Sequence, residues 1–382
     1  MTPVELSRTV LRAVRRAVED GELSVVVPEK ASVTVPGAGG WGDYATNIAL
    51  QLARPAGETP RRVAELLLPH LAGAQGVSAV EITGPGFLNI SLGSTASTSL
   101  VAEILRRGPR YGFVDGPTSA DDTPDAPTTH LVRLHAPHEP RALVVMDVVA
   151  RLLRSQGAHV RTSCETGPPE PVWATVLGVA EVDAYSSPQE PSAPPDVAVR
   201  PVPVPAPDLA ALLTLGRDAA RWALLHPAAH DRPRPTADHL VQREANPLFR
   251  VRYAYARTRA VSRNAADLGF TAQPGDVRDT HDAQGDVAEV TIPLAQELTL
   301  TPLLADHPRV LSRAATHRAP DLLARHLVAV ADATLALLPA VLPLGDEKPL
   351  AAHRARLALA EAAGAVLAGG LSLLGIDAPE HL

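Results

Sequence analysis

The chain of 382 residues contains few cysteine, lysine and aromatic residues. Its one cysteine, Cys164, excludes an intramolecular disulfide and a zinc site built from several cysteines. Lysine occurs only at Lys30 and Lys348, so nearly all of the 35 basic residues are arginines. Aromatic residues make up 3% of the chain and apolar residues 46%, which predicts aliphatic, largely helical cores.

The sequence also has no excess of positive charge and no obvious long apolar run. The net charge of −7 excludes a general attraction to nucleic acid, so any such site must be a local basic patch. Arginines interrupt the apolar residues near the N-terminus, which is untypical of a signal peptide. No stretch of about 18 residues is apolar enough to predict a membrane span. We therefore expect a soluble, cytoplasmic protein that does not contact a membrane.

Residues 1–114 predict a compact α/β domain. Thr2 and Glu5 form a capping-box pattern, with Pro3 at the first helical position. Alternating apolar residues on either side of Gly84-Pro85-Gly86 predict two strands joined by a tight turn. The expected elements are a helix over 3–20, a strand over 31–35, helices over 44–53 and from Pro60 onward, and strands over 77–83 and 87–92.

The rest of the chain divides at two changes in composition. Residues 115–129 are acidic and rich in proline, which predicts a linker. Residues 130–207 predict one βαβ unit, with strands over 131–134 and 159–163 and a helix over 140–156. Dense prolines follow, with short strands at 172–177 and 197–202. Residues 208–382 predict an all-helical bundle with a loop over 271–292 and helices over 208–226, 236–267, 297–315, 319–342 and 349–374. The expected fold class is multidomain α+β.

Two motifs suggest chemistry but lack the required context. Gly37–Gly42 fits the glycine pattern of a dinucleotide site, yet Thr59-Pro60 begins a helix where a second strand with an acidic end is required. His135 and His138 flank a proline without further metal ligands in the pattern. Cys164 is interpreted as a small buried residue. We predict no catalytic residue, no metal and no cofactor.

Arginines gather in the segment after residue 242. Arg252, Arg259 and Arg263 recur at helical spacing beside Tyr253, while Glu244 is the only acidic residue among them. Such a stripe fits phosphate contact with a stacking aromatic, although it also fits a solvated helix face. The predicted nucleic-acid contacts of this segment are Arg250, Arg252, Tyr253, Arg257, Arg259 and Arg263.

Three blocks of the sequence resemble arginyl-tRNA synthetase, a class I family. Residues 42–47 and 84–90 resemble its additional N-terminal domain, which contacts the tRNA elbow. The resemblance implies that Phe87 and Asn89 contact an unstacked base there. Residues 246–257, NPLFRVRYAYAR, resemble the signature helix of its DALR anticodon-binding domain. The segments 218–221, 371–376 and 378–380 extend that second resemblance to the end of the chain.

The middle block resembles the family but lacks its catalytic signatures. Residues 147–160 resemble the helix and strand that follow the class I His-x-Gly-His motif. That motif falls on Ala136-Pro137-His138-Glu139, so neither histidine is in register. No lysine-containing loop of the Lys-Met-Ser-Lys type precedes Asp218. The resemblance therefore implies a truncated paralogue with a degenerate catalytic core.

Three functions follow from these patterns. The first is a catalytically inactive, arginyl-tRNA synthetase-like protein that binds tRNA, of the arginine type, through its elbow- and anticodon-facing domains. The second is a protein-interaction module that docks on the genuine full-length synthetase or another partner. The third is an arginine–tRNA ligase with residual activity.

Overall fold

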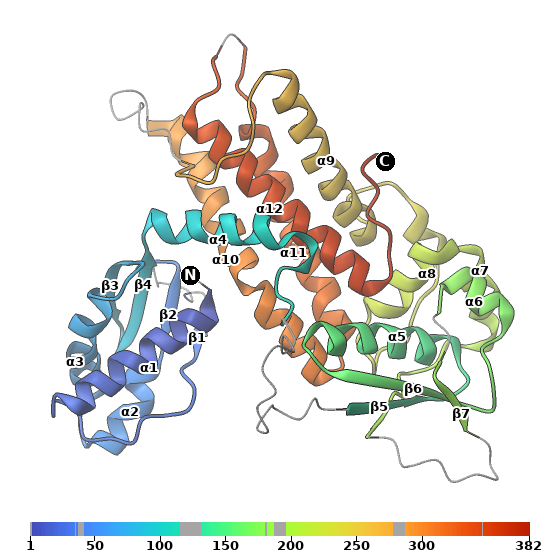
Figure 1. The fold of residues 1–382 in the computed structure, drawn as a ribbon, viewed down its shortest axis with the longest axis horizontal. Helices are drawn as coiled ribbons and strands as arrows, with labels where there is room; N and C mark the ends of the chain where they lie inside the picture. Colours follow the sequence, from blue (N-terminus) through green and yellow to red (C-terminus); the bar gives the residue numbers. More distant parts are fainter. Residues whose placement is uncertain are drawn as a thin grey trace, which may run out of the picture. The chain divides into compact units, whose positions relative to one another are not determined.

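The computed structural model describes residues 2–34, 36, 42–114, 131–179, 182–186, 196–277, 287–345 and 347–382. The chain divides into two compact units, here called unit 1 and unit 2 (Figure 1). Unit 1 comprises residues 1–106, 264–306 and 339–362, and unit 2 comprises residues 107–263, 307–338 and 363–382. The predicted linker 115–129 and most of the glycine motif, residues 37–41, lie outside the described residues.

The first helix of unit 1 confirms its sequence prediction. Helix α1 (Pro3–Glu19) begins with the capping box, in which the Glu5 carboxylate accepts the Thr2 backbone N–H at 2.7 Å. The Thr2 hydroxyl accepts the Glu5 N–H at 3.3 Å in return. Apolar residues at helical spacing then bury one face, including Leu6, Val10 and Val14. The opposite face of α1 points to solvent.

An antiparallel sheet supports this helix. Its strands β1 (Val33–Thr34), β2 (Tyr44–Thr46), β3 (Val77–Thr83) and β4 (Phe87–Leu92) lie in the order β1-β2-β4-β3. The predictions for β3 and β4 are confirmed. Helices α1, α2 (Ile48–Ala56) and α3 (Pro60–Ala72) share one core with Leu88 and Ile90 of β4.

One boundary in this sheet domain was wrong. The helix predicted over 44–53 starts only at Ile48, because Tyr44–Thr46 pairs with β4 as strand β2. The Thr46 hydroxyl accepts the Ile48 backbone N–H at 3.3 Å, which ends the strand and begins the helix. Helix α4 (Ser94–Arg107) follows β4 and was not predicted.

Unit 1 also contains the first parts of two long helices, α10 (Val287–His317) and α12 (Ala351–Leu374). The loop predicted over 271–292 is wrong from Val287 onward, where α10 begins. Arginines of α12 contact residues 270–277, the part of this region that the structure describes before α10. Arg356 donates from Nε to the Val277 carbonyl at 3.0 Å, and Arg354 lies over the Phe270 ring at 5.8 Å.

Unit 2 contains a parallel sheet that is larger than predicted. Strands β5 (Leu131–Ala136), β6 (His159–Glu165), β7 (Ala184–Ser186) and β8 (Val197–Ala198) lie in the order β7-β6-β5-β8. Helix α5 (Pro140–Ser155) connects β5 to β6 and runs along the sheet in Figure 1. The prediction of a single βαβ unit was therefore wrong, although the outer strands have only three and two residues. The strand order reverses between β5 and β8, where open α/β sheets bind their ligands.

A helix replaces one predicted strand in the proline-rich region. Residues 172–177 belong to α6 (Pro171–Leu177) rather than to a strand. Pro171 stands at the first helical position, where its missing N–H costs nothing, and Gly178 ends the helix at φ +59°. Proline density alone was thus a poor guide, because prolines that begin helices favour them. The strand predicted over 197–202 exists only at Val197–Ala198.

The remainder of unit 2 is helical, as predicted. It contains α7 (Leu209–Thr214), α8 (Gly216–Leu225), α9 (Pro247–Asp267), α11 (Pro320–Leu337) and the later parts of α10 and α12. The helix predicted over 208–226 breaks at Gly216, whose φ of +73° interrupts it. The helix predicted from residue 236 starts only at Pro247, after a short 3₁₀ turn at Ala237–Leu240.

Two helices contradict the expectation that no segment is apolar enough to span a membrane. Pro320–Ala340 and Ala351–Leu374 are long enough, with mean hydropathies of 1.5 and 1.8. Arg354, Arg356 and Glu361 do not break the second one, because an 18-residue apolar window with no more than two charged residues lies after Arg354. Half of the first window and 78% of the second are buried inside the protein, as in core helices of soluble folds.

A buried histidine makes the stability of unit 2 sensitive to pH. His307 of α10 is 2% exposed and stacks between Tyr111, at 6.0 Å, and His326, at 5.3 Å. Burial, and then the charge of His326, hold the pKa of His307 well below its ordinary value. The unfolded chain protonates this group near pH 6.5, whereas the folded chain keeps it neutral. The stability that neutral, buried His307 contributes is therefore fully present above pH 6.5 and is lost as the pH falls below that value.

We expect His307→Phe to reduce this pH dependence by about 1.4 kcal/mol per pH unit below pH 6.5. The measurement is the urea unfolding free energy at pH 7.5 and 5.5. His230→Gln is the control, because the His230 side chain is 86% exposed. An unchanged pH slope in the phenylalanine variant would contradict the assignment.

Candidate functional site

The arginine-bearing helix α9 begins at a buried asparagine. Asn246 donates from Nδ2 to the carbonyls of His239 and Val241, each at 2.9 Å. Its Oδ1 accepts the Leu248 backbone N–H at 3.1 Å, which caps the first turn of α9. The Asn-Pro sequence therefore fixes the preceding segment against the start of α9. This local order positions every side chain of the predicted stripe.

Two of the predicted contact arginines are already held by carboxylates of other helices. Arg250 donates from one nitrogen to both oxygens of Asp332, at 2.8 and 2.9 Å. Arg252 lies 3.6 Å from Asp218 of α8. Both side chains are about one quarter exposed, at 28% and 26%. Their charge is thus partly neutralised before any ligand arrives.

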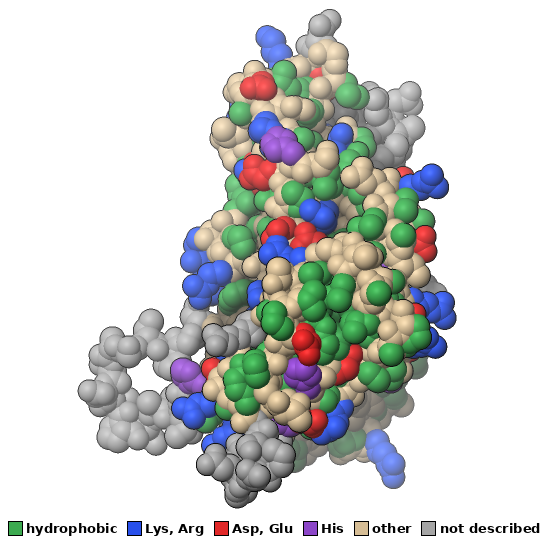
Figure 2. All heavy atoms as spheres, turned by 90° about the vertical axis from the view of Figure 1, so that its right-hand side faces the viewer, with side chains coloured by type: hydrophobic (Ala, Val, Ile, Leu, Met, Phe, Trp, Pro, Cys, Tyr) green, Lys and Arg blue, Asp and Glu red, His purple; other side chains and the backbone are tan. Residues whose placement is uncertain are grey.

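Two further arginines share one acidic partner near the C-terminus. Arg259 lies 3.2 Å and Arg263 3.9 Å from the Glu380 carboxylate. Figure 2 shows blue and red side chains scattered among apolar ones over one face of the molecule. The sequence segment suggested an almost unopposed basic stripe, but the fold brings Asp218, Asp332 and Glu380 to it from distant positions.

Three side chains of α9 form a stacked row along one helix face. The rings of Phe249 and Tyr253 lie 5.4 Å apart with an interplanar angle of 16°. Arg257 lies over the Tyr253 ring at 5.9 Å. Among the described residues, no carboxylate forms an ion pair with Arg257. An exposed ring next to an available guanidinium suits an unstacked base and its phosphate. We call Phe249, Tyr253 and Arg257 the α9 platform.

Sequence reasoning missed Phe249, although the signal was present. Phe249, Tyr253 and Arg257 repeat every four residues, which places them on one face of a helix. Phe249 also lines a hollow of about 460 Å³ on unit 2. Polar groups line the same hollow, including Asp218, His239, Gln242 and Arg252. Its volume lies in the range of small-ligand sites, so it can receive a single base.

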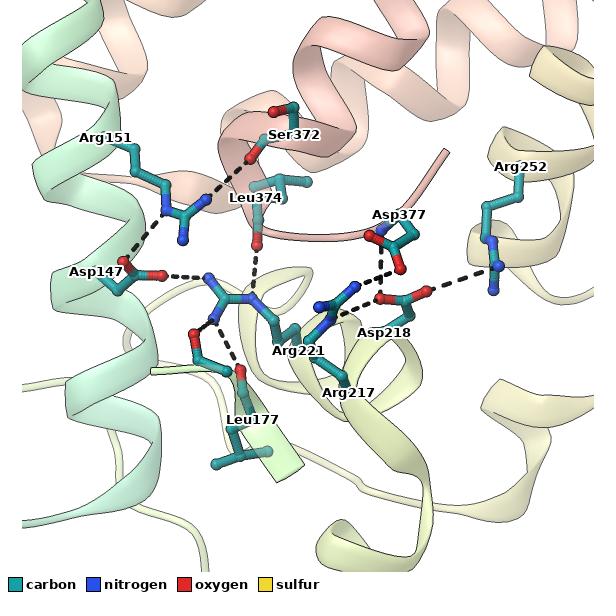
Figure 3. A network of polar contacts seen from close by, with 11 residues as sticks. Asp147, Arg151, Leu177, Arg217, Asp218, Arg221, Arg252, Ser372, Leu374 and Asp377 are labelled. Carbon is teal, nitrogen blue, oxygen red and sulfur yellow. Dashed lines mark hydrogen bonds and ion pairs between the residues drawn. The ribbon is translucent and has the colours of Figure 1, made fainter. Parts of the chain in front are cut away.

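A chain of charged groups lines this hollow, and Figure 3 shows its contacts. Arg252 pairs with Asp218, whose other oxygen pairs with Arg217 at 3.4 Å. Arg217 in turn pairs with Asp377 of the C-terminal segment. The Asp377 backbone N–H donates to Asp218 at 3.3 Å, which closes the chain.

A second, buried part of the same network ties the core sheet to the helical bundle. Arg221 is fully buried and donates to Asp147 of α5 at 2.6 Å. It also donates to the carbonyls of Leu374, at 2.8 Å, and Leu177, at 2.9 Å. Burial, opposed by the charge of Asp147, lowers the pKa of Arg221. Three segments of unit 2 are thus held by one guanidinium, as the dashed lines in Figure 3 show.

The predicted elbow residues of unit 1 differ in exposure. Phe87 is 40% exposed at the start of β4, while Asn89 is 2% exposed. The Asn89 amide donates to the Thr83 hydroxyl at 2.7 Å, so the fold holds it inside the sheet domain. The turn before Phe87 needs Gly86, because a Cβ there would lie 2.8 Å from the Pro60 backbone. Phe87 can meet a base directly, whereas the structure does not present the Asn89 amide to solvent.

The helix that follows the first core strand has an internal anion at its N-terminus. Glu139 caps α5, accepting the Ala142 backbone N–H at 2.8 Å with one oxygen. Its other oxygen accepts the Val204 N–H at 2.9 Å. The N-terminus of this helix would otherwise attract a phosphate group. His138, the next residue back, is bound to the Pro168 carbonyl at 2.9 Å and lies beside the Trp173 ring.

His135 and Cys164 have other neighbours than metal ligands among the described residues. His135 contacts the Ser163 hydroxyl at 2.9 Å and lies 3.7 Å from Glu165. Within the part of the chain that the structure describes, no three ligand-type side chains come close enough to hold a metal ion. Burial raises the pKa of the Cys164 thiol to about 11, so this thiol is a poor nucleophile at neutral pH.

Two family models match the chain, one in its N-terminal part and one in its C-terminal part. Residues 5–92 match the arginyl tRNA synthetase N-terminal domain. Residues 251–382 match the DALR anticodon binding domain. The matched segments contain Phe87 and Asn89 in one case and the α9 platform from Tyr253 onward in the other.

Curated relatives match part of the chain. An arginine–tRNA ligase of Renibacterium salmoninarum is 44% identical over 170 residues, which are 42% of this chain and 30% of the relative. The arginine–tRNA ligase of Frankia alni is 38% identical over 164 residues, which are 42% of this chain and 29% of that relative. The matches thus span less than one third of the length of these relatives.

Solved structures share the fold at low sequence identity. Thermus thermophilus arginyl-tRNA synthetase matches with a TM-score of 0.62 at 14% identity, and the comparison spans 100% of both chains. Plasmodium falciparum arginyl-tRNA synthetase matches with a TM-score of 0.64 at 10% identity, over 100% of this chain and 99% of that one.

The sheet domain, the parallel core and the DALR bundle define a protein built like an aminoacyl-tRNA synthetase. Both family models and the ligase relatives indicate the arginine-specific synthetase among these enzymes. The chain belongs to the arginyl-tRNA synthetase family.

Proposed function

We propose that this chain is a catalytically inactive member of its family that binds tRNA, of the arginine type. The anticodon-facing contacts are the α9 platform and the hollow beside it. The elbow-facing contact is Phe87 of unit 1, with Asn89 supporting the strand that carries it. The α9 platform is the observation that carries the proposal. In it an exposed tyrosine ring lies beside Arg257, which forms no ion pair with any carboxylate among the described residues. We place this function in the cytoplasm, where tRNA is used.

The four paired arginines then have a smaller role than the sequence suggested. Arg250, Arg252, Arg259 and Arg263 can reach phosphates only by exchanging partners with Asp332, Asp218 and Glu380. Exposed ion pairs are worth less than about 1 kcal/mol, so such an exchange is feasible. They support weak, shape-dependent attraction rather than base recognition.

The core sheet supports the absence of aminoacylation. Class I activation stabilises charge on ATP phosphates by groups placed at the helix that follows the first core strand. Here the carboxylate of Glu139 fills that helix N-terminus and repels a phosphate. The neighbouring signature positions hold Ala136 and Pro137, which offer no proton or charge. The outer strands are too short to build a full nucleotide crevice.

Arginine-dependent exchange between ATP and pyrophosphate tests the inactivity directly. We expect no exchange above the background of a protein-free reaction, with a full-length arginyl-tRNA synthetase as the positive control. Measurable turnover that disappears in His138→Ala would show that the core is active and would refute this part of the proposal.

Titration with arginine tRNA tests the binding. We expect binding that weakens steeply with salt, and Tyr253→Ala should lose about 1–3 kcal/mol of affinity because a stacked base loses its platform. Tyr185→Ala is the matched control, since Tyr185 is a similarly exposed tyrosine of unit 2, at 42%, outside the hollow. Equal affinity of the wild type for any duplex RNA of the same length would contradict the proposal.

The paired arginines favour one alternative, a docking module for the genuine synthetase or another protein. In that case, a partner would co-purify after nuclease treatment, and Arg252→Glu would leave docking intact. Loss of tRNA binding in Arg252→Glu, with no nuclease-resistant partner, would exclude this alternative.

A further inference from the structure

The most available positive charge in unit 1 lies on the outward face of α1. Arg8, Arg12, Arg15 and Arg16 are all exposed, and they recur at intervals that place them along one side of the helix. Among the residues that the structure describes, none of these four guanidinium groups forms an ion pair. Arg12 donates to the Thr9 hydroxyl at 3.1 Å, and this is the one side-chain hydrogen bond that the four arginines form within the described part of the chain.

This α1 row contrasts with the arginines of α9. Four of the five α9 arginines named above are paired with carboxylates, whereas the α1 row keeps its charge for an external partner. Paired arginines give up part of their attraction for phosphate, because a carboxylate must be displaced first. Of these two helices, α1 thus offers the arginines that no described carboxylate already holds, and the function proposed above makes no use of them.

A hollow adjoins the α1 row. It has a volume of about 790 Å³ and is lined from α1 by Arg12, Arg16 and Glu5, whose carboxylate is engaged by the Thr2 N–H of the capping box. His70, Gln75 and Ser78 contribute polar groups from the end of α3 and the start of β3. Such a hollow has room for one unstacked nucleotide, with hydrogen-bonding groups for its base and arginines for its phosphate.

The α1 row is separate from the elbow contact at Phe87. Leu88 and Ile90 of β4 face the core that they share with α1, so Phe87 lies on the other face of the same strand. An RNA that stacks on Phe87 and an RNA that lies along the α1 row therefore meet different sides of the sheet domain.

We propose that the α1 row and its hollow form an additional RNA-binding surface, which holds the backbone of a single-stranded RNA segment and one of its bases. The row from Arg8 to Arg16 extends over about 12 Å, long enough to meet more than one phosphate. RNA is favoured over an anionic membrane, because Val4 is the only exposed large apolar residue on this helix. It is favoured over an acidic protein, because the hollow is lined by groups that hydrogen-bond a base.

Salt-dependent binding of an arginine tRNA transcript and of a single-stranded RNA 12-mer tests the proposal. The triple variant Arg8→Gln, Arg12→Gln, Arg15→Gln should bind the 12-mer roughly fiftyfold more weakly at 0.15 M salt. The slope of log affinity against log salt should fall by about 2. Arg61→Gln with Arg62→Gln is the matched control, since these exposed arginines of the neighbouring helix α3 pair with Glu65. The control variant should leave the affinity for the 12-mer and the salt slope unchanged.

Crosslinking of the unmodified chain to RNA that carries 4-thiouridine provides a second test, independent of any effect of the substitutions on folding. Crosslinked peptides should include residues 3–19. Wild-type affinity and slope in the triple variant, or crosslinks confined to α9, would overturn this inference and leave the proposed anticodon contact standing. Retention on phosphatidylserine vesicles without RNA binding would overturn it as well. Loss of binding in Tyr253→Ala alone would support only the anticodon contact.

Discussion

Replacement of Arg221 by methionine is expected to destabilise unit 2 by about 3–5 kcal/mol. The guanidinium is fully buried and holds the Asp147 carboxylate together with the carbonyls of Leu177 and Leu374. Methionine fills similar space but leaves the Asp147 charge buried with only Arg151 as a partner, at 3.2 Å. A buried charge that loses its buried partner is costly because water cannot replace the lost ion pair.

Urea unfolding followed by hydrogen exchange of unit 2 measures this effect. Arg217→Met is the matched control on the same helix, because its pair with Asp377 is exposed and worth less than about 1 kcal/mol. The double variant Arg221→Met, Asp147→Leu should recover most of the lost stability, since it removes both charges. Equal destabilisation by the Arg217 and Arg221 variants would show that the buried pair has no special weight.

Replacement of Glu380 by glutamine is expected to raise the affinity for arginine tRNA roughly tenfold at 0.15 M salt. Glu380 lies against both Arg259 and Arg263, at 3.2 and 3.9 Å, and occupies the position that a phosphate would take. Removal of its charge frees two arginines, and each additional phosphate contact steepens the dependence on salt by about 0.7. On the proposed function, the C-terminal segment limits the RNA binding that we expect from the α9 stripe.

The control for this effect must change the net charge by the same amount. Asp208→Asn does so in unit 2 while breaking an ion pair with Arg232, away from α9. Filter titrations at 0.05–0.2 M salt should show the increase and the steeper slope only for the Glu380 variant. The same gain in both variants would assign the effect to net charge, and a loss of affinity would show that Glu380 helps to position the arginines for RNA.

Local signals explain most of the elements that the sequence predicted. The capping box at Thr2 and Glu5 and the glycine-rich turn before Phe87 involve residues close together in the chain, so their structure follows from the sequence alone. The errors had two causes, a pairing partner distant in the sequence and a proline whose effect on a helix start was misjudged. Tyr44 became part of a strand because β4, more than 40 residues later, pairs with it. Residues 172–177 became a helix because Pro171 favours a helix start.

The predictions for the candidate site also succeeded for local features and failed for contacts between distant residues. The spacing of Arg252, Arg259 and Arg263 showed a stripe on α9, and its position was correctly assigned to a helix. The sequence could not show that Asp218, Asp332 and Glu380 neutralise the stripe, because each lies far from its partner along the chain. It likewise could not show that Asn89 is closed off by its bond to Thr83.

The sequence by itself determined the family and the order of its two matched domains, because these depend on residue types at short spacing. Only the tertiary structure decided which arginines remain available for RNA. Ion pairs form between charges that folding brings together, such as Arg221 and Asp147, which are 74 positions apart. The charge that a helix offers to a ligand is therefore a property of the packed molecule rather than of the helix sequence.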